Sequence, residues 1–142
     1  ETRKLSKIPD EARAEISIYF VDSPPVVEKD EQKIPKLDDR TADYIRHGLT
    51  PRWSDLDLNQ HVNNVKYIGW IFESAPSSIM EDHELAAMTL EYRRECKRDS
   101  VVQSLTSVLD EDGGCGEIEC RHLLRLDGGG DVVKGRTAWR RK

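Results

Sequence analysis

The residues of this chain that could carry out chemistry are concentrated in one stretch, which runs from Arg52 to Glu73. Its first half places carboxylates, amides and a single imidazole close together: Asp55, Asp57, Asn59, Gln60, His61, Asn63 and Asn64. An imidazole beside a carboxylate and an amide can act as a general base in hydrolysis. The same side chains could instead do no more than hydrogen-bond the backbone of an ordinary loop.

The second half of this stretch turns apolar at helical spacing. Four residues recur three or four positions apart: Val65, Ile68, Phe72 and Ala75. Tyr67, Trp70 and Ile71 make much of the opposite side apolar as well, and a helix that is apolar nearly all round is normally buried. We therefore expect one long buried helix with Asn63 or Asn64 as its N-cap.

The start of such a helix presents free backbone N–H groups and the positive end of the helix dipole. The polar loop would then place His61, Asp57 and Asn59 beside a site that is suited to stabilising a developing oxyanion. The position of the helix makes the backbone N–H groups of Asn64 and Val65 the candidate donors to that oxyanion.

A second pair of reactive residues, Glu95 and Cys96, follows downstream and allows two mechanisms. In the first, a Cys96 thiolate attacks an acyl carbonyl, His61 takes the proton and Asn59 orients the imidazole. In the second, Glu95 and His61 activate a water molecule, while Asp57 and Asn59 hold the substrate and the imidazole.

The geometry of a β-strand favours Glu95 over Cys96. Neighbouring residues of a regular strand point to opposite faces, and Cys96 shares its face with the apolar Leu90 and Tyr92. Cys96 is therefore expected to fill space in the core. Glu95 could reach His61 at an interface with another subunit or repeat, although a β-bulge near Cys96 would reverse this assignment.

Outside this stretch the apolar residues change from helical spacing to alternation. We expect a short helix within residues 8–16, an end to the buried helix at Pro76 and a further helical turn within residues 77–85. Strands are expected at residues 43–53, 88–93, 101–109, 118–126 and 133–139, with turns at 110–116 and 127–131. His122 lies on the apolar face of its strand, so we interpret it as a hydrogen-bonded core residue rather than a ligand.

Two runs of sequence indicate a particular protein family more specifically than residue types alone can: DLNQHVNNVKYIGW at residues 57–70 and LEYRREC at residues 90–96. Both closely resemble the catalytic half of the plant acyl-acyl carrier protein thioesterases. The resemblance covers nearly the whole chain and is nearest to the B class, which favours saturated acyl chains.

This resemblance implies an α+β hotdog fold, in which a curved antiparallel sheet wraps around one long buried helix. Members of the family have two such repeats. Residues 1–35 would be the linker between the repeats, and residues 36–142 would be the C-terminal catalytic repeat, which pairs with a second repeat or forms a homodimer.

The resemblance also implies an activity, a partner and a compartment. The chain would hydrolyse the thioester of fatty acyl-acyl carrier protein, release a free fatty acid and so end chain elongation in fatty acid biosynthesis. Its partner would be an acyl carrier protein with a phosphopantetheine-linked acyl chain, in the plastid stroma, and the transit peptide would be absent from this fragment. The alternatives are an acyl-CoA thioesterase, or a non-catalytic acyl-binding or dimerising half.

Composition excludes several other classes of protein. The chain has 142 residues, of which 37% are hydrophobic and 35% charged, and it contains no apolar run of the length that a membrane span needs. The net charge of −5 argues against a general nucleic-acid binder. The three cysteines form no CxxC pair and the four histidines form no HExxH motif, so we expect no metal and no cofactor.

Positive charge is nevertheless clustered in residues 93–98, which contain Arg93, Arg94, Lys97 and Arg98. Such a cluster is usually the solvated end of a strand. Because acyl carrier proteins are acidic, the resemblance gives it a second interpretation, in which Arg93 and Arg98 dock the carrier.

Overall fold

The computed structural model describes residues 6–24, 33–110 and 117–142 of the chain. The chain divides into two compact units, Glu1–Gln32 and Lys33–Lys142. Most of the turn that was expected at residues 110–116, including Cys115, lies outside the described residues.

The first unit contains a short helix, α1 (Asp10–Ile16), which continues into a turn of 3-10 helix at Ser17–Tyr19. Pro9 precedes α1, and Asp10 and Glu11 occupy its first turn, where acidic side chains interact favourably with the helix dipole. This helix confirms the prediction for residues 8–16. None of its side chains is buried.

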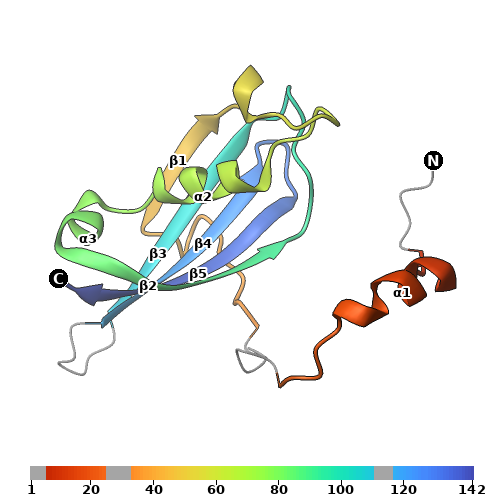
Figure 1. The fold of residues 1–142 in the computed structure, drawn as a ribbon. Coiled ribbons are helices and arrows are strands. Elements are labelled where there is room, and N and C mark those ends of the chain that lie inside the picture. Colours follow the sequence, from red (N-terminus) through yellow and green to blue (C-terminus); the bar gives the residue numbers. More distant parts are fainter. Residues whose placement is uncertain (1–5, 25–32, 111–116) are drawn as a thin grey trace. The chain divides into compact units, whose positions relative to one another are not determined.

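The second unit is built on an antiparallel sheet, which has five strands among the described residues (Figure 1). Along the sheet the strands follow the order β1-β3-β4-β5-β2, so β1 and β2 form its edges. Their bounds are Tyr44–Leu49 for β1, His83–Tyr92 for β2, Val102–Asp110 for β3, Glu117–Leu126 for β4 and Asp131–Arg141 for β5. The predicted strands and their antiparallel pairing are present, but β1 ends at Leu49 rather than at residue 53, and β2 begins at His83, within the range that was expected to be a helical turn.

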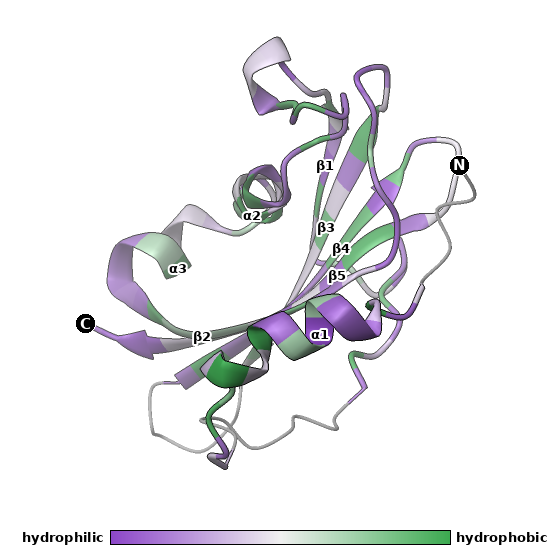
Figure 2. Ribbon diagram, turned by 45° about the vertical axis from the view of Figure 1, so that its right-hand side comes forward, coloured by the Kyte–Doolittle hydropathy of each residue, from purple (hydrophilic) through white to green (hydrophobic). Residues whose placement is uncertain are grey.

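The helix that follows the polar loop, α2 (Asn64–Phe72), lies against one face of this sheet and is seen nearly end-on in Figure 2. Tyr67, Trp70 and Ile71 are its buried side chains. They pack against sheet residues such as Val102, Leu124 and Val133 in the main core: Val62, Tyr67, Trp70, Ile71, Cys96, Val102, Leu124, Val132 and Val133. The α2 helix thus joins the polar loop to the core.

The prediction of one long helix that is buried all round is wrong in two respects. The α2 helix has only nine residues, and Val65, on the predicted apolar stripe, is 72% exposed. The helix ends early because the N–H groups of Ser74 and Ala75 bond to carbonyls only three residues back, and Pro76 then takes an extended conformation.

A second short helix, α3 (Ser77–Asp82), follows Pro76 and leads into β2. Ile79 of this helix packs with Cys120 and Trp139 of the sheet in a smaller apolar cluster. Within the described residues, no helix has the length and apolar character that crossing a membrane requires.

The other face of the sheet is covered by the segment that precedes β1. Leu37 of this segment packs with Leu105 of β3 and Leu123 of β4 in a separate apolar cluster. Ile34 of the same segment is also buried. Each face of the sheet therefore has its own apolar core.

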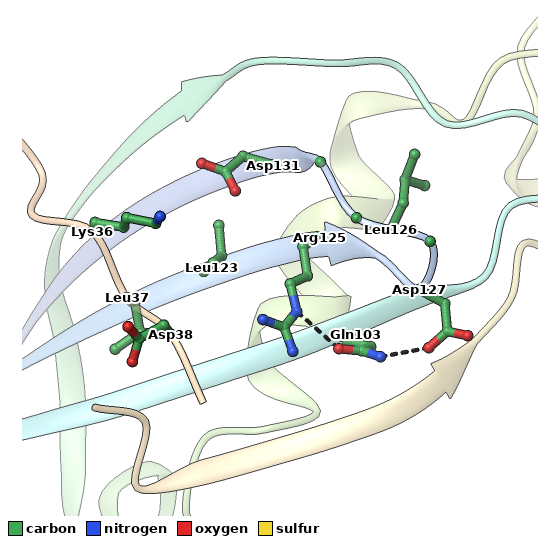
Figure 3. Close-up of a pocket in the computed structure, with 12 residues that line it drawn as sticks. Lys36, Leu37, Asp38, Gln103, Leu123, Arg125, Leu126, Asp127 and Asp131 are labelled. Atoms are coloured by element: carbon green, nitrogen blue, oxygen red, sulfur yellow. Dashed lines mark hydrogen bonds between the residues drawn. The ribbon is translucent and has the colours of Figure 1, made fainter. Parts of the chain in front are cut away.

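A polar cavity of about 470 Å³ lies beside the second face, next to the turn between β4 and β5 (Figure 3). Arg125 donates to Gln103 at 2.8 Å, and Gln103 donates to Asp127 at 2.5 Å. Arg125 also donates to Asp39. These side chains bond to one another, and they fasten the segment that carries Asp39 to the sheet.

A chain of buried hydroxyl groups and one imidazole runs between the end of α2 and the sheet. The Ser74 hydroxyl lies 2.7 Å from that of Ser104 and 2.8 Å from that of Thr106. His122 is hydrogen-bonded through both ring nitrogens, to Thr106 at 2.9 Å and to Thr137 at 2.8 Å. His122 is only 1% exposed, which confirms that it is a hydrogen-bonded core residue.

We predict that His122 makes the chain less stable in acid. Burial lowers its pKa from 6.5 to about 4, so the folded chain binds the proton less readily than the unfolded chain does. The stability due to the neutral ring is complete above pH 6.5 and is lost as the pH falls toward 4. Urea unfolding at pH 7 and pH 5 should show a loss of about 2 kcal/mol from this residue.

The comparison that isolates this contribution uses His122→Gln, whose unfolding free energy should depend less on pH between 7 and 5 than that of the original chain. The matched control is His47→Gln, because His47 is exposed on β1. An unchanged pH dependence in His122→Gln would contradict the prediction.

Candidate functional site

His61 lies in the loop between a short 3-10 turn, η2 (Trp53–Asp55), and the start of α2. The residue is largely buried, with 9% exposed. The loop pairs with the segment after β2 through an antiparallel bridge between His61 and Lys97. In addition, the Val62 N–H donates to the Cys96 carbonyl at 2.9 Å. This backbone pairing brings together the two reactive clusters of the sequence.

Asp57 determines the shape of the loop around His61. One oxygen of its carboxylate accepts hydrogen bonds from the backbone N–H groups of Asn59, at 2.8 Å, and His61, at 2.9 Å. The Asp57 N–H in turn donates to the His61 carbonyl at 2.7 Å. This tight turn forces Gln60 to a φ of 60°, a conformation that is uncommon for residues other than glycine. Asp57 therefore fixes the backbone of His61, while Asn59 is exposed at the surface.

Glu95 is the carboxylate that lies beside the imidazole. Its Oε2 atom is 3.7 Å from Nε2 of His61, which is longer than a direct hydrogen bond. The Glu95 side chain is 61% exposed and that of His61 is 11% exposed. Two groups at this separation can contact the same water molecule at the surface. Among the described residues, no cluster of three or more His, Cys, Asp or Glu side chains is arranged to hold a metal ion.

Cys96, by contrast, points into the core. Its exposure is 0%, and burial raises the pKa of its thiol. Because the thiolate is the nucleophilic form of cysteine, this environment disfavours attack by Cys96. The β2 strand ends at Tyr92, so the regular strand through Cys96 on which the parity argument depended is absent, but Glu95 is exposed and Cys96 is buried as expected.

The start of α2 is capped by Asn63, whose side chain accepts a hydrogen bond from the Val65 N–H at 3.1 Å. The cap thus occupies one of the two predicted oxyanion donors and leaves the Asn64 N–H as the other candidate. Asp55 stabilises the same region, because its carbonyl accepts from the Asn63 N–H and its carboxylate lies 3.6 Å from the Lys66 ammonium.

The predicted docking residues, Arg93 and Arg98, are both exposed. Arg93 forms an ion pair with Glu91, and the guanidinium of Arg98 lies 5.5 Å from the centre of the Trp53 ring. Trp53 is 69% exposed and lines a surface pocket of about 460 Å³ together with four loop residues: Leu56, Asp57, Leu58 and Gln60. This pocket was not predicted from the sequence, although large apolar residues in a polar loop, such as Trp53 and Leu58, were a signal for it.

The antiparallel sheet, the helix on one of its faces, and the pair formed by His61 before that helix and Glu95 after β2 define a hotdog domain of the thioesterase type. The chain belongs to the acyl-ACP thioesterase family, because the profile of the acyl-ACP thioesterase C-terminal domain matches residues 38–141.

Curated relatives agree with this assignment. The chain is 64% identical over 142 residues to the chloroplastic palmitoyl-acyl carrier protein thioesterase of Cuphea hookeriana, with 100% of this chain and 34% of the relative covered. It is 65% identical over 145 residues to the protein of the same name from Arabidopsis thaliana, with 99% and 35% covered. The chain therefore spans about a third of the length of these relatives.

A solved structure, the 12:0-ACP thioesterase from Umbellularia californica, superimposes with a TM-score of 0.88 at 55% identity. The match covers 99% of this chain and 51% of that one. An oleoyl thioesterase (putative) from Lactobacillus plantarum shares the fold, with a TM-score of 0.75 at 24% identity and with 99% of this chain and 52% of that one covered.

We predict that Asp57→Ala loosens the backbone of His61. The substitution removes the acceptor of two loop N–H groups, so the His61 amide proton should exchange with solvent at least about tenfold faster, which NMR measures directly.

Asp38→Ala is the matched control, because the Asp38 carboxylate also accepts hydrogen bonds from the backbone N–H groups of its own turn, at Arg40 and Thr41. That turn lies in the segment before β1. Equal effects of the two variants on the exchange of the His61 amide proton would show that Asp57 has no special role at the site.

Proposed function

We propose that the protein to which this chain belongs hydrolyses the thioester of fatty acyl-acyl carrier protein. Hydrolysis releases a free fatty acid and the carrier thiol, and so ends chain elongation in plastid fatty acid biosynthesis. The observation that carries the proposal is the position of Glu95 Oε2, 3.7 Å from His61 Nε2, in a domain of the acyl-ACP thioesterase family. The names of the relatives from Cuphea hookeriana and Arabidopsis thaliana support the substrate and the compartment.

In the proposed reaction, one water molecule contacts both the His61 imidazole and the Glu95 carboxylate. The pair takes a proton from this water as its oxygen attacks the acyl carbonyl. The tetrahedral intermediate then collapses, the carbon–sulfur bond breaks and the thiolate leaves. A thiolate is a stable anion near neutral pH, so its departure needs less protonation than that of an amine.

Other residues of the loop support this reaction. Asp57 holds the backbone of His61 through two hydrogen bonds, and the exposed Asn59 contacts the substrate. The N–H of Asn64, in the first turn of α2, stabilises the oxyanion, where the dipole of the helix favours negative charge. The alternative mechanism would require the Cys96 thiol to leave the core, where it is 0% exposed.

The proposed assembly pairs this repeat with a second hotdog repeat, or with another copy of itself. The β2 strand supports pairing, because it lies at the edge of the described sheet and bonds to β5 on its other side. Edge strands accept further strands readily. Because Glu95 lies in the segment that follows β2, a partner along this edge would lie beside the His61–Glu95 pair and complete the acyl site.

Two other functions fit part of the same observations. An acyl-CoA thioesterase would use the same His61–Glu95 pair, and the assay that separates the two compares one acyl group on both carriers. A non-catalytic acyl-binding half is favoured by the coverage, since the chain spans only 34% of its Cuphea hookeriana relative. Thioesterase assays of this chain alone, and of this chain joined to the first repeat of that relative, test this alternative. The catalytic predictions below are made for the joined two-repeat protein.

We predict that Glu95→Ala lowers kcat by about 10²–10⁴-fold, because the pair loses the carboxylate that contacts the water. Cys96→Ala should retain turnover within about tenfold of the unsubstituted protein, since the thiol takes no part in this mechanism. His61→Ala should nearly abolish hydrolysis of a palmitoyl carrier-protein thioester, measured as free thiol released.

Circular dichroism of each variant provides the control for folding. Turnover that survives in Glu95→Ala and disappears in a folded Cys96→Ala would exclude the water mechanism and favour the thiol. An active His61→Ala would contradict both mechanisms.

We predict that the basic cluster distinguishes the two carriers. The double variant Arg93→Glu and Arg98→Glu should lower kcat/KM for the carrier-protein thioester at least about tenfold at low salt, because charge complementarity speeds association. The value for the matching acyl-CoA should change by less than about threefold. The control is Arg141→Glu, an exposed charge whose position pairs with His83 at the far end of β2.

An equal fall in kcat/KM for the two thioesters would exclude a docking surface that is specific for the carrier protein. A loss that persists unchanged at high salt would also exclude it, because salt screens interactions between exposed charges.

A further inference from the structure

The hydroxyl group of Tyr67 lies beneath the segment that carries Glu95. Tyr67 is in α2 and is only 2% exposed. Its oxygen accepts a hydrogen bond from the Cys96 N–H at 3.0 Å. The ring is held by edge-to-face contacts with Trp70 and Tyr92, at centroid distances of 5.7 and 6.0 Å. This hydroxyl is therefore fixed in position by the core.

The N–H that Tyr67 binds belongs to the peptide bond between Glu95 and Cys96. The carbonyl group of Cys96 is also held in place, because it accepts a hydrogen bond from the Val62 N–H at 2.9 Å. The β2 strand has already ended at Tyr92, so pairing within that strand does not extend to Glu95. Two hydrogen bonds, one from α2 and one from the catalytic loop, thus hold the backbone beside Glu95.

Burial keeps the Tyr67 hydroxyl in its neutral form, since it raises the pKa of the phenol to about 12. A neutral hydroxyl accepts the Cys96 N–H bond throughout the pH range of an ordinary enzyme assay. This contact is therefore a constant feature of the site.

We infer that the Tyr67 hydroxyl is a positioning group for the hydrolytic reaction, which sets the separation of Glu95 from His61 through the backbone of Cys96. The inference rests on the proposed function and extends it to a residue that does not touch the substrate. Because α2 begins at the cap beside His61 and also carries Tyr67, one rigid helix turn would hold both members of the catalytic pair.

Removing this hydroxyl should disturb Glu95 more than it disturbs substrate binding. In Tyr67→Phe, the Cys96 N–H loses its acceptor in the core, and a buried donor without a partner is unfavourable. The peptide would rotate or shift toward a new acceptor, and Glu95 would move with it. A displacement of about 1 Å in a catalytic group costs on the order of 10²-fold in rate.

The test compares Tyr67→Phe, Glu95→Gln and the double variant in the joined two-repeat protein. Tyr67→Phe should lower kcat by about 10- to 100-fold and change KM by less than about twofold. In the Glu95→Gln background, the same substitution should lower kcat by less than about twofold, because the group that it positions is already disabled. A purely structural role would lower the rate equally in both backgrounds.

Tyr92→Phe is the matched control. Its ring belongs to the same aromatic cluster, 6.0 Å from that of Tyr67, and the residue is 47% exposed. Loss of the Tyr92 hydroxyl should leave kcat within about twofold of the original value. A similar fall in kcat in both variants would show that any change in this aromatic cluster has the effect, and would overturn the inference.

A second measurement needs no variant at all. The Cys96 amide proton should be protected from exchange with solvent in the folded protein, because its bond to Tyr67 is buried. Exchange as fast as that of an exposed amide would overturn the inference, even if Tyr67→Phe failed to fold.

The outcomes also separate the inference from the proposed function. If Glu95→Gln keeps full turnover, the water mechanism itself fails. If Glu95→Gln loses turnover while Tyr67→Phe has no effect, or has the same effect in both backgrounds, only the role of Tyr67 fails.

Discussion

A short backbone pairing determines the geometry of the candidate site. The Val62 N–H binds the Cys96 carbonyl, and His61 forms an antiparallel bridge with Lys97. This pairing joins the loop before α2 to the segment after β2, and neither His61 nor Glu95 belongs to a helix or a named strand. The pairing involves main-chain atoms, so the side chains on either side are left to perform chemistry. Asp57 bonds the loop on one side of the pairing, and the Tyr67 hydroxyl bonds the other side.

The α2 helix can hold the site although it is short. A helix of nine residues is barely stable alone in water, so the packing of Tyr67, Trp70 and Ile71 on the sheet must stabilise it. Its ends are also fastened: the side chain of Asn63 caps the first turn, and the Ser74 hydroxyl bonds to the sheet. The position of the loop that carries His61 is thus a direct result of core packing.

The sequence was sufficient to predict most of the strands, the order of polar loop and helix, and the burial of Cys96 and His122. The periodicity of the apolar residues explains this success, because alternation in strands and helical spacing in helices indicate which side chains face a core. The same reasoning overestimated the length of α2, since the apolar spacing continues to Ala75 although the backbone has already turned. It also gave no reason to expect buried polar residues such as Ser104 and Thr106 at the sheet–helix interface, because their hydrogen-bond partners are distant in the sequence.

The pairing of His61 with Glu95 was expected at an interface, whereas both groups meet within this one repeat. Strand parity favoured Glu95 over Cys96, and Glu95 lies beside His61, although β2 ends at Tyr92 and neither residue belongs to a regular strand. Parity could not predict the backbone pairing or the hydrogen bond between the Cys96 N–H and the Tyr67 hydroxyl, because these depend on contacts between the loop, α2 and the segment after β2. Long-range contacts of this kind leave no periodic pattern in a single sequence.

The segment before β1 changes where the folded domain should be considered to begin. Leu37 is 5% exposed and Ile34 is 8% exposed, yet the family profile starts only at residue 38. A protein shortened to the limits of that profile would lose Leu37 and uncover Leu105 and Leu123 on the second face of the sheet. Such a truncated domain would expose an apolar surface and aggregate, although His61 and Glu95 were both still present.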